Sequence, residues 1–292
     1  MVDELVTPPK VTCREITAEL LPAAEKMLNE GFPERSRAFW SRAIGRLAKR
    51  RVPEGYPRFG FLLMNGGEPA GCILTIFSNA PGDNRPAVRC NFSAYYTQPA
   101  FRTYASMLTS RAFRLKEVTF LNISPRANTL PLVEAQGYKR YSDGSLIVAA
   151  WRLPALPQLS IERFNPAAEE TPGLTANEHD ILADHASFGC LALVCRSPSG
   201  ASPLVLQYRR IIKRIVPVAH VIYCRSMDEF VPVAGSVGRY LARRGAPLML
   251  VDTDGDLPPL SGRKLDLPKF YKGPVRPRLG DLSYTELPIL GI

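Results

Sequence analysis

The sequence predicts an α/β protein with two tandem halves, each a mixed, mostly antiparallel central sheet flanked by helices. Three observations predict this fold class. Apolar residues form 46% of the chain and charged residues 22%, as in ordinary globular domains. A length of 292 residues exceeds one typical core and suits two domains of roughly 150 residues each. The order of expected elements in residues 10–152 begins again after a proline-rich connector.

The first half alternates strands and helices. Residues 10–16 read as a strand, and residues 17–30 as a helix that Thr17 caps, because apolar residues then recur at helical spacing. Residues 34–51 predict a second helix, with Phe39 and Trp40 on its apolar side. The remaining expected elements are strands at 58–64, 70–78, 87–97, 117–124 and 145–153, a helix after residue 98 and a short helix at 127–138.

The second half repeats this order without repeating the sequence. Thr175, followed by Glu178, predicts a capped helix over 175–189. Further expected elements are strands at 190–197, 202–210, 217–226 and 246–255, a helix at 228–245 and a strand-like end at 282–290. These patterns suggest domains at 1–153 and 174–292, joined by a proline-rich linker at 154–173.

Charge and cysteine content indicate the class of protein. The net charge of +10 favours anionic partners such as nucleic acid, an acidic membrane surface or a polyphosphate, and it equally suits a solubilising surface. The six cysteines form no CxxC pair and indicate a reduced, cytoplasmic protein. No apolar run approaches the ~18 residues of a membrane span. The first ten residues lack the apolar region of a secretory signal.

The stretch at residues 95–113 places the end of a strand directly before a helix. Such a junction directs unpaired N–H groups to one point, and the helix dipole adds positive character there. Pro99, Phe101 and Arg102, with Ala105 after them, resemble the cofactor loop of the GNAT superfamily of acyl-CoA N-acyltransferases. The run from Asn128 to Gly137 and Tyr138 resembles a helix motif of the same superfamily. The resemblance covers residues 10–152 by motif and 174–292 by element order alone.

The resemblance implies acetyl-CoA or another acyl-CoA as co-substrate. It also departs from the family pattern at three positions. Thr103 and Met107 stand where the family has glycine or another small residue, and Val133 stands where it has a tyrosine that protonates the departing thiolate. The residues that the resemblance places at the cofactor are Tyr96, Thr97, Arg102, Thr103, Tyr104, Ala105, Ser106 and Asn128.

Catalysis in such a fold needs few groups. A backbone N–H of the bulged fourth strand holds the thioester carbonyl, and a base accepts a proton from the amine. Tyr95 and Tyr96 end that strand in the first half, and His220 lies in the corresponding strand of the second; all three are candidates. The alternatives are that His220 is a hydrogen-bonded core residue and that the tyrosines pack at a rim. No His or Cys spacing indicates a metal site, since His179 and His185 do not share a helix face.

The second strand-to-helix junction differs from the first. Asp228 and Glu229 begin its helix, and Val231 stands opposite Arg102. Carboxylates at a helix start complement the dipole and repel a pyrophosphate. We therefore expect one cofactor site per chain, in the first half.

Two hypotheses of function follow. In the first, the chain is an acyl-CoA-dependent N-acyltransferase that moves an acetyl or other acyl group to a small-molecule or peptide amine. An acidic acyl carrier protein is a variant donor that suits the basic surface. In the second, the fold is a catalytically inactive binding module for nucleic acid or another polyanion. Val133 and the missing loop glycines favour the second hypothesis, whereas the Pro99-x-Phe101-Arg102 run favours the first. The acceptor, acyl length and oligomeric state stay open.

Overall fold

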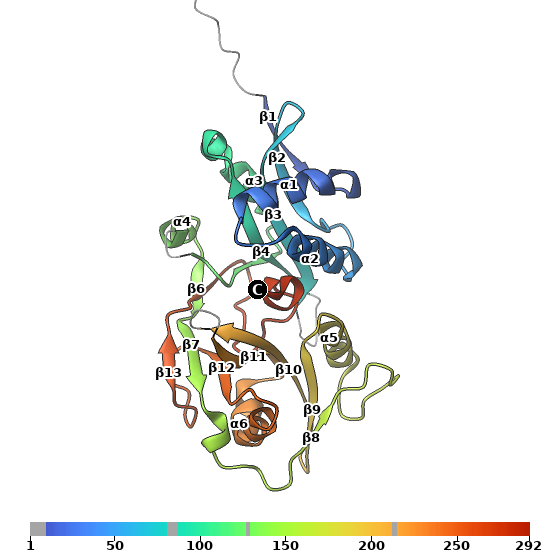
Figure 1. Ribbon diagram of the computed structural model, residues 1–292, viewed down its shortest axis with the longest axis vertical. Helices are drawn as coiled ribbons and strands as arrows, with labels where there is room; N and C mark the ends of the chain where they lie inside the picture. The colour runs from blue at the N-terminus through green and yellow to red at the C-terminus, as the bar shows by residue number, and fades with distance from the viewer. Residues whose placement is uncertain (1–9, 81–86, 127–128, 212–214) are drawn as a thin grey trace, which may run out of the picture. The chain divides into compact units, whose positions relative to one another are not determined.

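The computed structural model describes residues 10–80, 87–126, 129–211 and 215–292 (Figure 1). The chain forms two compact units, Met1–Phe120 and Leu121–Ile292. This division lies upstream of the 154–173 linker that the sequence suggested. The difference arises because strands after residue 121 pair with strands of the second unit, and no local pattern reveals such pairing.

The first unit is a sheet covered by three α-helices. Its strands follow the order β1-β2-β3-β4-β5, and β1 to β4 are antiparallel neighbours. Its elements are β1 (Val11–Glu15), α1 (Leu21–Gly31), α2 (Arg37–Lys49), β2 (Gly60–Asn65), β3 (Glu68–Asn79), β4 (Val88–Thr97), a 3-10 helix (Pro99–Tyr104), α3 (Ser106–Ala112) and β5 (Thr119–Asn122), which carries the boundary between the units. The β2–β3 turn places Gly66 at φ 61°, as expected of an Asn-Gly hairpin.

Helix α2 begins and ends on specific side-chain contacts. The hydroxyl of Ser36 accepts a hydrogen bond from the Phe39 N–H at 3.2 Å and caps the first turn. The inner face buries Trp40, Ala43, Ile44 and Leu47. Just past the last turn, the buried guanidinium of Arg50 donates to the carbonyl of Phe77 at 2.8 Å. That contact fixes the end of α2 to strand β3.

Gly45 lies in the middle of α2, on the side away from the core. A Cβ built at this position meets no atom within 4 Å. Because glycine disfavours a helix interior relative to alanine, Gly45→Ala is expected to raise the free energy of unfolding by about 0.5–1 kcal/mol. Urea unfolding measures the change. Gly60→Ala is the opposite control, since Gly60 has φ +134° and its Cβ would lie 2.1 Å from the Ile73 carbonyl oxygen. A lower midpoint for Gly45→Ala would refute this account of α2.

The second unit contains a seven-stranded sheet in the order β13-β7-β12-β11-β10-β9-β8 (Figure 1). Among the strand pairs between described residues of this sheet, only β11 and β12 are parallel. The elements are α4 (Leu130–Ala135), β6 (Lys139–Ser142), β7 (Gly144–Val148), β8 (Ser160–Arg163), α5 (Ala176–Ser187), β9 (Leu191–Ser197), β10 (Gly200–Ile211), β11 (Val216–Cys224), α6 (Met227–Ala242), β12 (Leu248–Thr253), β13 (Arg263–Leu265) and β14 (Lys269–Lys272). The mixed, mostly antiparallel sheet confirms the predicted fold class.

Helices α5 and α6 each pack on a hydrophobic core of the second unit. One core contains Val237 and Leu241 of α6, and the other contains Ile181 and Leu182 of α5. Helix α5 begins on the capping box that the sequence predicted: Thr175 Oγ1 accepts from the Glu178 N–H at 3.2 Å, and Glu178 Oε2 accepts from the Thr175 N–H at 2.9 Å. These caps fix where α5 starts.

Two local expectations for the second unit were wrong. The predicted linker contains strand β8, which pairs with β9. The strand expected at 282–290 is instead a turn followed by a π-helix, Leu287–Gly291. Its alternating pattern resembles a strand, but Tyr284 adopts φ 52° and breaks the extended backbone.

Candidate functional site

The end of strand β4 carries a β-bulge in the first unit. Cys72 pairs with Tyr96 and Leu74 with Ser93, so Ala94 and Tyr95 together lie opposite one residue of β3. Ala94 adopts φ 49°, a left-handed conformation that non-glycine residues rarely adopt. A bulge leaves a residue outside the regular ladder and re-aims the groups around it. The fourth strand therefore has the irregularity that thioester binding requires in the acyltransferases that it resembles.

Tyr96 is fixed against the last turn of α1. Its hydroxyl donates to Glu30 Oε1 at 2.9 Å, and Gln98 Nε2 donates to Glu30 Oε2 at 3.1 Å. The Tyr96 ring lies over Gly31, where an added Cβ would come within 2.3 Å of the ring Cγ. Burial and the bond to Glu30 raise the pKa of Tyr96. The result is an exposed carboxylate, that of Glu30, held by two donors that follow the bulge in sequence.

The sequence patterns did not single out Glu30. One signal points to it: a carboxylate in the last turn of a helix opposes the macrodipole, so its position has a cost that the helix alone does not explain. Its partners come from a strand 66 and 68 residues later, which no local pattern reveals.

Tyr95 lies within the bulge itself and is half-buried. Burial raises the pKa of Tyr95 to about 12. The phenol therefore stays neutral at physiological pH, and a neutral phenol can donate a hydrogen bond.

The segment after β4 forms a tight helix where the family has an open glycine loop. The backbone N–H of Phe101 donates to Gln98 O at 2.9 Å, and that of Ala105 donates to Arg102 O at 3.1 Å. The 3-10 helix Pro99–Tyr104 leads almost directly into α3. Because i→i+3 bonds engage amides along such a helix, an anion there would depend mainly on side chains.

The predicted cofactor residues lie along this segment with different exposures. Arg102, Thr103 and Ser106 are exposed; Tyr104 and Ala105 are half-buried; Asn128 lies outside the described residues. The Thr97 hydroxyl is buried and has no hydrogen-bond partner in the part of the chain that the structure describes. Three side chains of phosphate-binding type, one arginine and two hydroxyls, thus face solvent after the bulged strand.

The second unit repeats the bulge and the junction. Val205 pairs with Tyr223 and Leu206 with Val221, so Ile222 is the extra residue in β11. Pairing between β11 and β12 is limited to residues 218–220 and 248–250, and beyond them the two parallel strands separate. A bulged strand followed by a helix therefore occurs in both units.

In the second unit, the chain itself occupies the strand edge beside this bulge. The Leu282 N–H donates to Ile222 O at 2.7 Å, and the Cys224 N–H donates to Gly280 O at 2.9 Å. The guanidinium of Arg278 donates to Cys224 O at 2.6 Å. Leu282 is 1% exposed, so this segment belongs to the core. The edge groups of β11 at Ile222 and Cys224 are already hydrogen-bonded, which leaves no such groups for a donor there.

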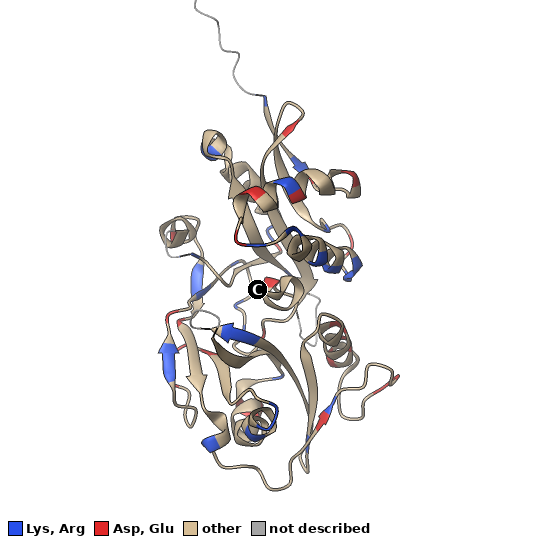
Figure 2. Cartoon of the chain, in the orientation of Figure 1, with Lys and Arg blue, Asp and Glu red and all other residues tan. Residues whose placement is uncertain are grey.

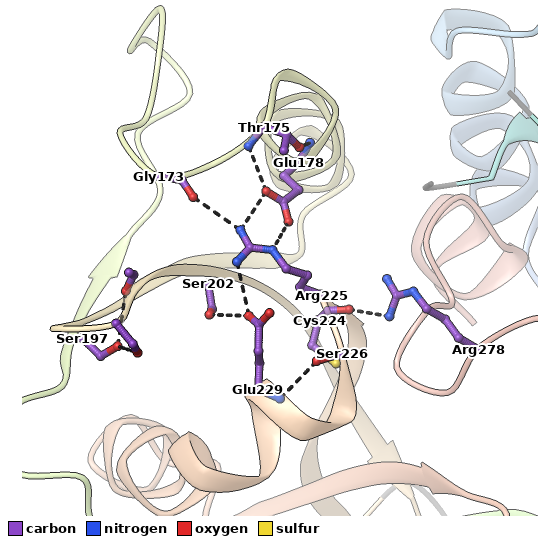
Figure 3. Close-up of polar contacts among 12 residues, drawn as sticks. Gly173, Thr175, Glu178, Ser197, Ser202, Cys224, Arg225, Ser226, Glu229 and Arg278 are labelled. Atoms are coloured by element: carbon purple, nitrogen blue, oxygen red, sulfur yellow. Dashed lines mark hydrogen bonds and ion pairs between the residues drawn. The ribbon is translucent and has the colours of Figure 1, made fainter. Parts of the chain in front are cut away.

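The start of α6 is also closed by side chains of the second unit (Figure 3). Arg225 Nε lies 2.6 Å from Glu178 Oε1, and its Nη1 lies 3.3 Å from Glu229 Oε2. The Ser202 hydroxyl donates to the same Glu229 oxygen at 2.7 Å, and Ser226 caps α6 by accepting from the Glu229 N–H at 3.1 Å. The two carboxylates and Arg225 thus pair with one another at the start of α6.

His220 lies in a buried polar cluster of the second unit, whereas Tyr95 and Tyr96 belong to the first. Arg209 Nη1 lies 3.1 Å from His220 Nδ1, and Asp252 Oδ1 lies 3.5 Å from Nε2. Asp252 in turn accepts from Lys269 at 2.7 Å and from Ser145 at 2.7 Å. Burial lowers the pKa of His220 to about 4, so its ring is neutral at pH 7. This enclosure favours the interpretation of His220 as a core residue.

The described residues contain neither a candidate metal-ion cluster nor a candidate membrane-spanning helix. No three His, Cys, Asp or Glu side chains gather closely enough to hold a metal ion. No helix in the described ranges is long and apolar enough to cross a membrane.

Comparison with known proteins gives the fold. No protein-family model and no curated protein matches the sequence. Among solved structures, a GCN5-related N-acetyltransferase from Anabaena variabilis is 8% identical with a TM-score of 0.59, covering 90% of this chain and 72% of that one. A GCN5-related N-acetyltransferase from Kribbella flavida is 12% identical with a TM-score of 0.55, covering 90% and 71%.

The GCN5-related glucosamine N-acetyltransferase region of a fungal β-N-acetylglucosaminidase is 10% identical, with a TM-score of 0.59 over 93% of this chain and 39% of that chain. Identities this low show architecture rather than activity. The bulged fourth strand, the helix after it and these structural matches together show that the chain has the GNAT fold, that of the GCN5-related N-acetyltransferases.

Proposed function

We propose that the protein is an acyl-CoA-dependent N-acyltransferase that transfers an acetyl or other acyl group to an amine. Acyl-CoA binds the first unit, between the end of β4 and the start of α3. The observation that carries this proposal is the bulge at Ala94, because it places irregular backbone directly before a segment with an exposed arginine. The closed junction of the second unit supports a single site per chain.

The first unit supplies groups for each task. Arg102 pairs with a phosphate of the donor, and the hydroxyls of Thr103 and Ser106 add hydrogen bonds. A backbone N–H at the bulge binds the thioester carbonyl and stabilises its developing negative charge. The neutral phenol of Tyr95 donates a hydrogen bond to the departing sulfur, a role that the buried Val133 cannot take.

Glu30 handles the proton of the acceptor. Its carboxylate binds the acceptor ammonium, which loses a proton to it and becomes a nucleophilic amine. The amine nitrogen then bonds to the thioester carbon, the carbon–sulfur bond breaks, and the second proton of the former ammonium leaves the new amide nitrogen for water. The departing thiolate, whose thiol has an ordinary pKa of about 8.5 by analogy with cysteine, takes the proton from Glu30. Tyr96 and Gln98 hold the carboxylate in position throughout.

The acceptor is a small-molecule or peptide amine. The structural likeness to a glucosamine N-acetyltransferase region makes amino sugars the first small molecules to test. An acyl carrier protein is the alternative donor, since its acidic surface would complement the net charge of +10.

A catalytically inactive fold that binds a polyanion is the second candidate. The apolar Val133 and the helical segment in place of a glycine loop favour it. Thiol release from acetyl-CoA and octanoyl-CoA, with glucosamine, spermidine and a short peptide with a free N-terminus as acceptors, separates the two. Amine-dependent release above the rate without enzyme supports the transferase. No release with any pair, together with no acyl-CoA binding, would leave only the binding module.

A further inference from the structure

The basic charge of the chain is concentrated in one segment of the first unit. Residues 35–53 contain six arginines and one lysine and no acidic residue, a formal charge of +7 against +10 for the whole chain. Helix α2 lies within this segment, and Figure 2 shows basic residues along it without acidic ones between them. The carbonyls of Phe77 and Arg58 engage the buried Arg50. The other six cations of the segment are Arg35, Arg37, Arg42, Arg46, Lys49 and Arg51.

Several of these cations lie on the outward face of α2. Arg42 and Lys49 are exposed and Arg46 is half-buried. At 100° per residue these three lie within an arc of about 60°, over about 10 Å of helix. Arg37 lies about 140° around the helix from Arg42, and Arg51 lies past the end of the helix, so neither belongs to this row. Arg42, Arg46 and Lys49 form a basic ridge along one face of α2.

The stability of helix α2 does not favour these residues at these positions. Arg42 and Arg46 are one turn apart, so their like charges repel. Gly45 lies between them in open space, although alanine would make a better helix. Local rules broken together on a surface indicate a function for that surface.

We propose that the basic ridge of α2 binds the phosphate backbone of double-stranded nucleic acid. Two of its three cations are arginines, whose planar fork fits phosphate oxygens. Gly45 lets a backbone approach the helix closely. Among the described residues, none of the exposed large apolar side chains lies on α2. An acidic protein partner would need such an apolar anchor, and a single strand would need an aromatic stacking platform. A duplex backbone needs neither.

Fluorescence anisotropy with a labelled 20-bp DNA duplex and an RNA duplex of the same sequence tests the proposal with the full chain. Counterion release predicts that log K falls with log[KCl] by about 0.9 for each DNA phosphate contacted, so the three cations of the ridge give a slope of up to about −2.7. Arg42→Gln with Arg46→Gln is expected to make the slope shallower by about 1.8 and to weaken binding at least tenfold in 50 mM KCl. The two duplexes show whether DNA or RNA is preferred.

The matched control is Arg243→Gln with Arg244→Gln, an exposed pair just past α6 that removes the same charge. It is expected to leave the slope unchanged. Circular dichroism melts verify that both double variants fold. No binding of either duplex in 50 mM KCl, or the same change of slope in both double variants, would overturn the proposal. So would binding of purified acyl carrier protein at the ridge without binding of duplex. Titration of the Arg42→Gln, Arg46→Gln variant with acetyl-CoA tests the proposed transferase site separately from the ridge.

Discussion

Glu30→Gln is expected to lower kcat/KM for acyl transfer by about 10²–10⁴-fold, the usual contribution of a positioned general base. The amide oxygen can keep one of the two hydrogen bonds that the carboxylate accepts from Tyr96 and Gln98, but the amide cannot take a proton from the acceptor. Tyr96→Phe removes the 2.9 Å bond that positions the carboxylate and is expected to cost about tenfold, with a shifted pH–rate profile. Thiol release at a series of pH values measures both effects.

Glu25→Gln is the matched control, because Glu25 lies on the same helix and contributes only its backbone carbonyl, to Asn29. It should leave kcat/KM unchanged. Acyl-CoA binding should also be unchanged in Glu30→Gln, since the carboxylate serves the acceptor. Activity of Glu30→Gln within twofold of wild type, with the same pH profile, would remove Glu30 from the mechanism.

The second large effect is a loss of stability in mild acid caused by His220. Burial lowers the folded-state pKa of His220 from 6.5 to about 4. Between these values the unfolded chain binds a proton that the folded chain does not, so stability falls as pH falls. At 1.36 kcal/mol per pH unit, the loss from pH 6.5 to pH 4 is about 3 kcal/mol. The nearby charges have opposite effects on this pKa: Asp252 favours the charged ring and raises it, whereas Arg209 and Lys269 disfavour the charged ring and lower it.

His220→Gln removes this titration and is expected to flatten the pH dependence of the urea midpoint between pH 4.5 and 6.5. His179→Gln is the control, because His179 has no such enclosure and is only half-buried. The carboxyl of Asp252 does not contribute in this window. Burial alone would raise its pKa, but Lys269 and His220 hold that pKa below its usual range. A midpoint that stays pH-dependent by the same amount in His220→Gln would contradict the assignment.

Local rules predicted much of the fold. The Thr175–Glu178 capping box and the Asn-Gly turn at Gly66 depend on neighbours within a few residues, and both occur as expected. Pairing across the sheet was not predictable in this way. Strand β7 pairs with β12, more than 100 residues later in the sequence, and β8 is a short edge strand hidden among prolines.

In the candidate site too, local sequence predicted some residues, whereas others depend on contacts between distant parts of the chain. The residues of the β4–α3 junction could be named from sequence because the strand, proline, aromatic and arginine are contiguous. Glu30 could not, because its role depends on meeting Tyr96 and Gln98 in space. The closure of the second junction by Gly280 and Leu282 depends on a segment near the chain end that no repeat pattern connects with β11.

Calorimetric titration with acetyl-CoA tests the central claim, one acyl-CoA site in the first unit, most directly. Wild type is expected to bind one molecule per chain. Arg102→Ala should weaken binding about tenfold or more, because a charged hydrogen bond to phosphate is lost. Arg225→Ala, at the closed junction of the second unit, is the comparison and should leave affinity and stoichiometry unchanged. No binding by wild type at millimolar acetyl-CoA, or weakening by Arg225→Ala alone, would contradict the account.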